Sequence, residues 1–259
     1  MTNNNPIGLF DSGIGGTSIW SAIHELLPNE DTIYLADSKN APYGQKSKEE
    51  IIRLSFKNTE LLLEMKCKII VVACNTATTN AIASLRAKYD VPFIGIEPAI
   101  KPAALHSQTQ KIGILATKGT LNSELFYKNV EKFQDIAVIE QIGHGLVELI
   151  ENGKINSSEM NQLLHSYLNP MIEQNIDYLV LGCSHYPYLI PQIEKILPKN
   201  IKIIDSGEAV AKQTKNILEE KVGFRNAAQK SSQIFYTNSN PKVLSDIIEN
   251  NCQVISKDF

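Results

Sequence analysis

The sequence has little of several features that mark particular classes of protein. Its 259 residues include four cysteines and one tryptophan, and the net charge is only −3. Four cysteines in a chain of this length favour free thiols over a disulfide framework. Lys and Arg total 25 against 28 for Asp and Glu, and no basic stripe stands out. We therefore expect no nucleic-acid partner.

Long apolar runs are also missing. The longest uncharged apolar run has about seven residues, whereas a membrane-spanning helix needs roughly 20. Residues 1–6 are polar and do not begin an apolar stretch like that of a signal peptide. These absences predict a cytoplasmic protein that makes no membrane contact.

What the sequence does contain is an alternation of short β-rich runs with longer amphipathic stretches. Runs such as KIIVVA and DYLVLG are continuously apolar, which is typical of strands buried on both faces of a parallel sheet. A helix is expected after Ser47, where Ser47 and Glu50 predict a capping box. The pattern predicts an α/β fold with mostly parallel sheets. The expected strands are Ile7–Asp11, Thr32–Asp37, Lys68–Ala73, Phe93–Ile96, Lys111–Ala116, Asp135–Gln141, Asp177–Gly182, Ile201–Asp205, Gln233–Tyr236 and Gln253–Ile255.

Two landmarks recur in the same order along the chain. IGLFDSG begins at Ile7 and IGILATKG at Ile112, an offset of 105 residues, and Cys74 and Cys183 are offset by 109 residues. Chance similarity between strand-loop-helix units is the alternative. The interpretation we favour is two similar α/β halves. Because ligands of open α/β sheets bind beyond the carboxyl ends of the strands, Cys74 and Cys183 would face each other across one cleft.

Cys74 and Cys183 each follow a buried strand and precede polar residues. A thiol near a helix N-terminus is expected to have a lowered pKa. A lone cysteine is more often a core residue, but two at matched strand ends favour a function. Cys67 and Cys252 lack this context and are interpreted as structural.

His185 lies two residues after Cys183, on the same predicted loop. From there it could hydrogen-bond the thiol or a substrate and share a proton near neutral pH. A Cys-x-His pair could also be half of a zinc site, but CNT at Cys74 supplies no partner at metal-ligand spacing. We therefore predict no metal. The remaining histidines need no special role; they are His24, His106, His144 and His165.

The loop FDSGIGG contains two candidate site residues, Asp11 and Ser12. Gly13 and Gly15 fit the start of a dinucleotide fingerprint, but Ser18 stands at the third glycine position and the Asp11 charge would oppose a pyrophosphate. The glycines would instead let backbone amides approach a small anion, with Asp11 as a buried carboxylate that tunes an amine or a thiol. Helix N-capping by Asp11 and Ser12 is the alternative.

Two further loops follow predicted strand ends. NAPYGQKS contains Pro42, Tyr43 and Gly44, which suit a tight turn and would form a cleft wall at the end of the second strand. ATKGT, at the equivalent place in the second half, offers the hydroxyls of Thr117 and Thr120.

Two thiols on opposite sides of a cleft suit inversion at a carbon centre. One thiolate removes a proton from one face, and the opposite thiol returns a proton to the other face. Disulfide chemistry would require the sulfurs to be within bonding distance, and the sequence has no C-x-x-C motif.

The motifs FDSGIGG, PYG, CNTA and GCSHYP together resemble those of the glutamate racemases, and the resemblance runs from Ile7 to FYTNSNP near Tyr236. It implies cofactor-independent interconversion of L- and D-glutamate, with D-glutamate supplied to peptidoglycan. Cys74 would act on the D enantiomer and Cys183 on the L enantiomer, assisted by Asp11 and His185. Glu151 matches an acidic residue near the site, with an exposed carboxylate at a helix end as the alternative. The implied substrate contacts are Asp11, Ser12, Tyr43, Gly44, Asn75, Thr76, His185 and, with a weaker match, Thr117 and Thr120.

The resemblance also implies a two-domain fold with glutamate bound between the domains. The expected division is residues 1–98 with 206–259 in the first domain and residues 99–205 in the second. A homodimer is expected, and no cofactor, because no phosphate-anchoring lysine loop for pyridoxal phosphate is evident. One position departs from the family pattern, since Ser184 stands where threonine is usual. Serine keeps the hydroxyl, so we expect Ser184 to hydrogen-bond the substrate.

Three other functions stay open on the sequence alone. An aspartate racemase or related isomerase would share the mechanism, although CSHYP and DSGIGG favour glutamate. A metabolite-binding module would not exchange an α-proton. A thiol-redox protein would join Cys74 and Cys183 in a disulfide.

Overall fold

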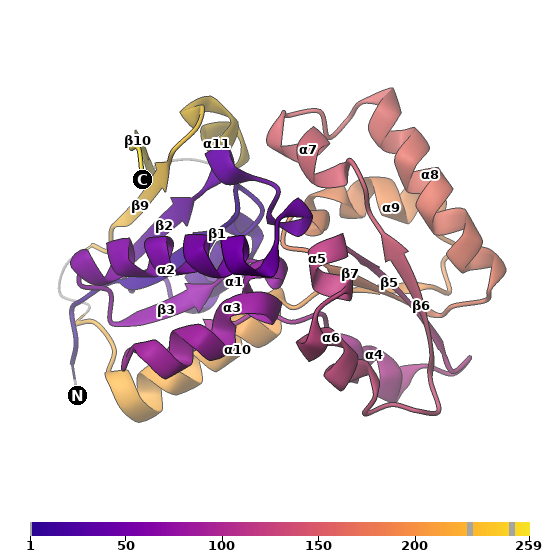
Figure 1. Ribbon diagram of the computed structural model, residues 1–259, viewed down its shortest axis with the longest axis horizontal. Coiled ribbons are helices and arrows are strands. Elements are labelled where there is room, and N and C mark those ends of the chain that lie inside the picture. The colour runs from indigo at the N-terminus through magenta and orange to yellow at the C-terminus, as the bar shows by residue number, and fades with distance from the viewer. Residues whose placement is uncertain (1, 227–229, 249–251) are drawn as a thin grey trace.

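Two parallel β-sheets lie side by side and carry helices on their faces (Figure 1). The computed structural model describes residues 2–226, 230–248 and 252–259. The six-stranded sheet has the order β10-β9-β2-β1-β3-β4, and the four-stranded sheet has the order β6-β5-β7-β8. Neighbouring strands pair in parallel. The predicted α/β class is confirmed.

The predicted strands are all present, and their ends differ from the predicted ends by no more than two residues. The strands are β1 (Ile7–Asp11), β2 (Thr32–Ala36), β3 (Ile69–Val72), β4 (Phe93–Gly95), β5 (Lys111–Ala116), β6 (Ala137–Ile142), β7 (Tyr178–Gly182), β8 (Lys202–Ile204), β9 (Gln233–Thr237) and β10 (Gln253–Ser256). The α-helices are α1 (Thr17–Leu26), α2 (Lys48–Glu64), α3 (Asn75–Lys88), α4 (Ile100–His106), α5 (Lys118–Leu121), α6 (Glu124–Val130), α7 (Leu146–Glu151), α8 (Ser158–Glu173), α9 (Ile190–Ile196), α10 (Gly207–Ile217) and α11 (Pro241–Ile247). Shorter helical segments are η1 (Ser38–Asn40), η2 (Tyr43–Gln45), η3 (Tyr186–Leu189) and η4 (Leu218–Val222).

The helix predicted after Ser47 is α2, but the capping box is only half formed. The Ser47 hydroxyl accepts a hydrogen bond from the Glu50 backbone N–H at 3.2 Å. The Glu50 carboxylate turns instead to Arg53, one turn further along the helix, at 2.8 Å. An exposed guanidinium offers two donors in a fixed geometry, which here replaces the reciprocal bond to Ser47.

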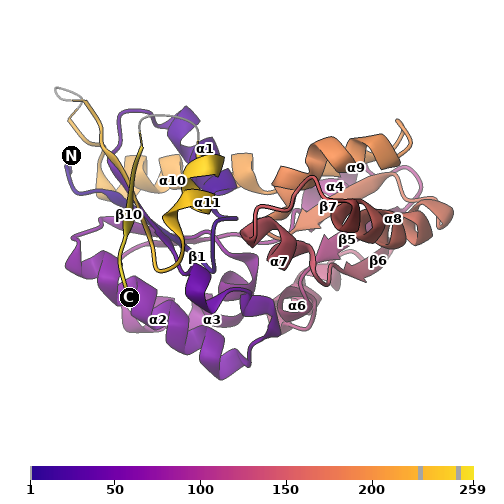
Figure 2. The same ribbon diagram turned by 90° about the horizontal axis from the view of Figure 1, so that it is seen from above.

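The continuously apolar runs form strands that are buried on both faces. Every residue of β1, β3 and β7 is buried, whereas the edge strand β6 is partly exposed. Figure 2 shows α2 and α3 on one face of the first sheet and α1 with α10 on the other. Apolar clusters fill the space between each sheet and its helices, as expected for helices packed on a parallel sheet.

The internal repeat in the sequence corresponds to a repeat in topology. The order β2-β1-β3-β4 in the first sheet is matched by β6-β5-β7-β8 in the second. Cys74 follows β3 and Cys183 follows β7, so the two cysteines come after equivalent strands. The register places Phe10 opposite Val72 and Ala116 opposite Gly182. The residues that follow these strands therefore gather at the carboxyl edges of both sheets.

The second sheet is inserted within the chain of the first. Its strands lie between residues 111 and 204, whereas the first sheet is built from strands within 7–95 and 233–256. The division into 1–98 with 206–259 and 99–205 stays a prediction. Among the described residues, no helix has both the length and the apolar character that a membrane crossing requires.

Candidate active site

Cys74 and Cys183 line a single cavity between the carboxyl edges of the two sheets, and both are free thiols. Most of the predicted site residues line the same cavity, namely Ser12, Tyr43, Gly44, Asn75, Thr76, Thr117, Ser184 and His185. Pro42, which belongs to the turn predicted to form a cleft wall, and Val147, which the sequence analysis did not select, complete its wall. Asp11, Glu151 and Thr120 lie one contact behind it.

Cys74 occupies the N-cap position of α3, where its sulfur accepts the Ala77 N–H at 3.4 Å and donates to the Ser12 hydroxyl at 3.6 Å. The expected lowering of its pKa is wrong. Burial raises the pKa of the Cys74 thiol well above its ordinary value, and the charge of Asp11 raises it further. Burial and a neighbouring negative charge both disfavour a thiolate, and here they outweigh the helix N-terminus. Cys74 is therefore held as a thiol.

Asp11 is fully buried at the end of β1 and connects the two sheets. One carboxylate oxygen accepts the backbone N–H groups of Gly13 at 3.2 Å and Gly16 at 3.0 Å. The other accepts the Ser184 hydroxyl at 3.1 Å. Burial raises the pKa of Asp11, although the charge of His185 and the bond from Gly16 oppose the rise. Asp11 therefore both caps the glycine loop and presents a proton-binding group beside the Cys74 thiol.

The amides of Gly13, Ile14 and Gly16 bond to the protein's own carboxylates rather than standing open for an anion, and the Gly15 amide faces His185. Besides the two bonds to Asp11, Ile14 N–H donates to Glu151 Oε1 at 2.7 Å, and Gly15 N–H approaches His185 Nε2 at 3.2 Å. The expectation of an anion-binding loop is therefore wrong for this structure. The glycines serve close approach instead, since a Cβ on Gly15 would lie 2.2 Å from His185 Nδ1.

His185 joins Cys183 to Glu151. Its Nδ1 lies 3.8 Å from Cys183 Sγ, and its Nε2 lies 2.6 Å from Glu151 Oε1. Burial alone would lower the pKa of His185, but hydrogen bonds to Cys183 and Glu151 and the charges of Asp11 and Glu151 outweigh it. The pKa of His185 thus lies well above its ordinary value. The imidazole is held as an imidazolium, with one N–H toward the sulfur and the other toward the carboxylate.

Glu151, the last residue of α7, is not an exposed helix-end carboxylate. Only 12% of its side chain is exposed, and it reaches across to the first sheet. Its Oε1 binds Ile14 N–H and His185, while its Oε2 accepts the Ser38 hydroxyl at 2.9 Å. Three donors thus surround this partly buried carboxylate, which is placed as the acceptor for the N–H of the His185 imidazolium.

Asn75 is the predicted substrate contact with the clearest geometry. It is 2% exposed and lines the cavity, yet neither its Nδ2 nor its Oδ1 has a hydrogen-bond partner in the protein. Buried amides are nearly always satisfied, so a buried amide without a partner that faces a cavity indicates a ligand. Next to it, the hydroxyls of Thr76, Thr117 and Thr120 lie 2.8 to 3.4 Å apart and bridge α3 to the second sheet.

Two predicted contacts have their polar groups engaged elsewhere. The Tyr43 hydroxyl is bound to Asp37 and accepts from Asn58 Nδ2 at 3.0 Å, so only its ring and backbone remain for the cavity. Ser184 donates its single proton to Asp11 and retains only acceptor capacity for a substrate. Gly44 is needed for close packing, because a Cβ there would lie 2.8 Å from Thr117 Cβ.

Sequence reasoning missed Ser38 and Asp37, which support the site from behind. Asp37 is fully buried and holds the Tyr43 turn, and Ser38 bonds Glu151. Their only signal was their place at the end of a predicted strand, where Asp37 is the last strand residue and Ser38 follows it. Of the cysteines considered structural, Cys67 packs beneath Gly8, and burial raises the pKa of Cys67 to about 12.

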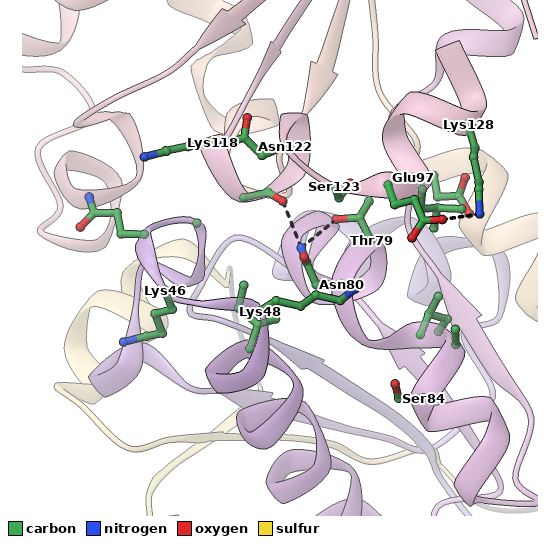
Figure 3. A pocket seen from close by; sticks show the side chains of 18 of the residues that line it. Lys46, Lys48, Thr79, Asn80, Ser84, Glu97, Lys118, Asn122, Ser123 and Lys128 are labelled. Carbon is green, nitrogen blue, oxygen red and sulfur yellow. Dashed lines mark hydrogen bonds and ion pairs between the residues drawn. The ribbon is translucent and has the colours of Figure 1, made fainter. Parts of the chain in front are cut away.

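A larger groove of about 900 Å³ lies beside the cavity and shares Gly44 with it (Figure 3). Asn80 closes part of the wall between them, donating to the carbonyls of Thr76 at 2.8 Å and Gly119 at 3.0 Å. The groove is lined by more basic than acidic side chains, with Lys46, Lys48, Arg86, Lys118 and Lys128 against Glu97 and Glu124. An anion that approaches from this side therefore meets a positively charged surface.

Comparison with known proteins gives concordant matches. A sequence profile of the family described as Asp/Glu/Hydantoin racemase matches residues 7–214. A glutamate racemase from Pseudomonas entomophila is 42% identical over 245 residues, which cover 94% of this chain and 92% of the relative. The solved structure of a glutamate racemase from Bacillus anthracis superposes with a TM-score of 0.88 at 31% identity, covering 98% of this chain and 97% of the other. The Escherichia coli glutamate racemase, solved with L-glutamate and the activator UDP-MurNAc-Ala, gives a TM-score of 0.88 at 30% identity and covers 97% of each chain.

Proposed function

Because the chain belongs to the Asp/Glu/Hydantoin racemase family, we propose that it interconverts L-glutamate and D-glutamate by proton transfer between two thiols. The observation that carries the proposal is that Cys74 and Cys183, free thiols after equivalent strands of two sheets, line one cavity. Relatives at 40–42% identity over 94% of the chain are glutamate racemases, which favours glutamate over aspartate as the substrate.

The reaction requires one sulfur without its proton and one with it. A thiolate takes the α-proton from one face of glutamate, and the electron pair of the broken C–H bond is delocalised into the α-carboxylate. The opposite thiol then donates its proton to the other face, which inverts the centre and leaves a thiolate there. Atoms and charge balance without an added reactant, so we propose that no cofactor takes part.

The surroundings of the two sulfurs suggest which of them carries a proton before the substrate binds. His185 Nδ1 lies 3.8 Å from Cys183 Sγ and is placed to exchange a proton with it, whereas burial and Asp11 favour a thiol at Cys74. The resting protein would then meet L-glutamate with Cys183 as base and Cys74 as acid. For D-glutamate, Asp11 is placed to take the Cys74 proton. This assignment agrees with the faces that the family resemblance implies.

Substrate binding requires the cavity to widen. Its volume of about 10 Å³ has room for about one water molecule, which is less than glutamate needs. Asn75 and Thr76 come from α3 on the side of the first sheet, and Thr117 follows β5 of the second sheet. A movement between the sheets would therefore admit the substrate and then close on its carboxylates. The positive groove beside Gly44 would attract the dicarboxylate.

Three further properties belong to this proposal. D-glutamate would supply peptidoglycan synthesis, the protein would act in the cytoplasm, and it would form a homodimer. Size-exclusion chromatography with light scattering checks the homodimer, and a mass near 28.8 kDa would instead indicate a monomer.

The deciding experiment is incubation with L-glutamate in D₂O, in the presence of a metal chelator and without pyridoxal phosphate. We expect α-deuterium in both enantiomers, because the returned proton comes from a thiol that exchanges with solvent. The Cys74→Ala and Cys183→Ala variants should each lose racemisation, and serine at either position should be nearly as inactive. Cys67→Ala is the matched control that removes a buried thiol outside the cavity.

The single-thiol variants also test the assignment of faces. Cys74→Ala should retain slow exchange of L-glutamate only, and Cys183→Ala that of D-glutamate only. Full racemisation by either folded variant would contradict the two-thiol mechanism. The opposite enantiomer preference would keep the mechanism and reverse the faces. Equal activity on aspartate would contradict the substrate assignment.

A further inference from the structure

The carboxylate of Glu151 is held by residues of both sheets. Its Oε1 contacts His185 Nε2 at 2.6 Å and Ile14 N–H at 2.7 Å, and its Oε2 accepts the hydroxyl of Ser38 at 2.9 Å. Ser38 begins η1, two residues after the end of β2, whereas Glu151 ends α7 beside the second sheet. The Ser38 bond is therefore the contact to the oxygen of Glu151 that faces away from His185.

The orientation of this carboxylate decides what His185 can do. The last torsion of a glutamate side chain is broad and roughly two-fold, so two bonds that share Oε1 leave the carboxylate plane free to turn. A third bond, made to Oε2 by Ser38, fixes the plane. His185 Nε2 has a second neighbour, since Gly15 N–H also points at that nitrogen at 3.2 Å. The orientation of Glu151 therefore determines which of the two groups His185 Nε2 binds.

His185 Nε2 cannot donate to Glu151 and accept from Gly15 at the same time. With Glu151 correctly oriented, Nε2 carries a proton and donates it to the carboxylate, and the other ring nitrogen faces Cys183. With Glu151 turned away, Nε2 would lose its acceptor and could accept the Gly15 N–H instead. We propose that Ser38 is a positioning residue whose hydroxyl holds Glu151 in the orientation that keeps His185 protonated beside Cys183.

A neighbouring contact between the same two segments provides a control. The Gln45 side-chain amide donates to Glu148 Oε1, again from the segment after β2 to α7, one helical turn before Glu151. Among the described residues, no hydrogen bond joins Gln45 to Glu151 or to His185. A variant at Gln45 therefore weakens the same connection between the sheets without releasing the Glu151 carboxylate.

The inference rests on the proposed racemase function and is tested with an isosteric pair. Ser38→Thr keeps the hydroxyl and Ser38→Val replaces it with a methyl of the same shape. We expect Ser38→Val to have a kcat about tenfold below that of Ser38→Thr, with KM little changed, as for loss of one hydrogen bond to a charged group. Gln45→Ala should alter KM more than kcat, because it affects only the closing of the two sheets around the substrate.

The second readout is the His185 ring itself. Long-range ¹H–¹⁵N spectra, assigned with His185→Asn, should show both ring nitrogens of His185 protonated in wild type and Ser38→Thr and a changed Nε2 signal in Ser38→Val. Equal kcat values and equal ring signals in the Thr and Val variants would overturn the inference while wild-type racemisation stands. An effect of Gln45→Ala equal to that of Ser38→Val on both readouts would also overturn it. Failure of the proposed function would show separately, as wild-type protein that exchanges no α-proton.

Discussion

The carboxylate of Glu151 occupies the space that a side chain on Gly13 would need. A Cβ built on Gly13 would lie 1.9 Å from Glu151 Oε1. Gly13 follows β1 of the first sheet, and Glu151 ends α7 beside the second. The missing side chain of one residue is therefore what allows the other to reach His185.

Gly13→Ala should displace Glu151 at little cost to stability, because the end of a long side chain yields more easily than backbone. The displaced carboxylate would leave His185, and a shift of about 1 Å at such a group can lower kcat by on the order of 10²-fold. Steady-state racemisation and thermal unfolding measure the two effects. Gly207→Ala, where the nearest atom is 3.1 Å away in a side chain outside the cavity, should retain activity. A fully active Gly13→Ala protein would contradict the placement of Glu151.

Asn75→Leu should raise stability and remove substrate binding together. The Asn75 amide has no partner in the protein, so replacing it with an apolar side chain of similar size removes a buried unsatisfied group, which costs about 1–3 kcal/mol. Asn58→Leu is the matched control, because Nδ2 of the buried Asn58 donates to Tyr43 and Asp37 and only its Oδ1 has no partner. The control should lose stability in urea unfolding. Destabilisation of Asn75→Leu similar to that of Asn58→Leu would mean that the Asn75 amide has a structural partner.

Asp11→Asn and His185→Asn should slow the two directions of the reaction unequally. Asp11 lies beside Cys74, and His185 beside Cys183, and a positioned proton-transfer group contributes roughly 10² to 10⁴-fold. Because the equilibrium constant of a racemisation is one, kcat/KM must agree in both directions. The asymmetry must therefore appear in kcat and in α-deuterium isotope effects. Identical isotope effects in both directions for both variants would contradict these role assignments.

Stability should fall as the pH rises above 9, and the buried Cys67 thiol should contribute to the fall. Burial raises the pKa of Cys67 from 9.0 to about 12. Above pH 9 the unfolded chain therefore releases a proton that the folded protein still holds, and each such thiol lowers stability by up to about 1.4 kcal/mol per pH unit. Cys74, whose pKa is also raised, acts with the same sign.

Urea unfolding between pH 8 and 10.5 measures this slope. Cys67→Ala should be less stable at pH 8, where a cavity is the cost, but its stability should decline less steeply with pH. Cys252→Ala, which removes a less buried thiol, should change the slope less. Parallel curves for wild type and Cys67→Ala would show that Cys67 titrates normally in the folded protein.

The sequence was sufficient to predict the strands and the repeat because buried parallel strands leave continuous apolar runs. It also placed Cys74 and Cys183 correctly, since their positions depend only on where equivalent strands end. It gave the wrong direction for the pKa of Cys74, because the helix N-terminus is local while burial and Asp11 come from tertiary packing. The partners of the glycine loop were missed for the same reason, as Glu151 and His185 come from the other sheet.

Ser38 shows a different limit of sequence reasoning. A serine after a strand end is common, and its value here depends on one carboxylate oxygen 113 positions later in the chain. Neither hydrophobic periodicity nor motif spacing predicts the hydrogen bond between Ser38 and Glu151. The half-formed capping box at Ser47 has a local cause instead, because Arg53, one helical turn after Glu50, binds the Glu50 carboxylate in place of the Ser47 backbone.

The insertion of the second sheet within the chain of the first has a consequence for folding during synthesis. Strand β2 pairs with β9, whose residues are about 200 positions later, while the strands of the second sheet are contiguous between 111 and 204. During synthesis the second sheet can close as soon as its own residues emerge, whereas the first must wait with one edge of β2 open until β9 arrives. Long-range parallel pairing is slow, and open strand edges invite aggregation. The nascent chain is therefore most vulnerable in that interval, with the later sheet already folded and the earlier one unfinished.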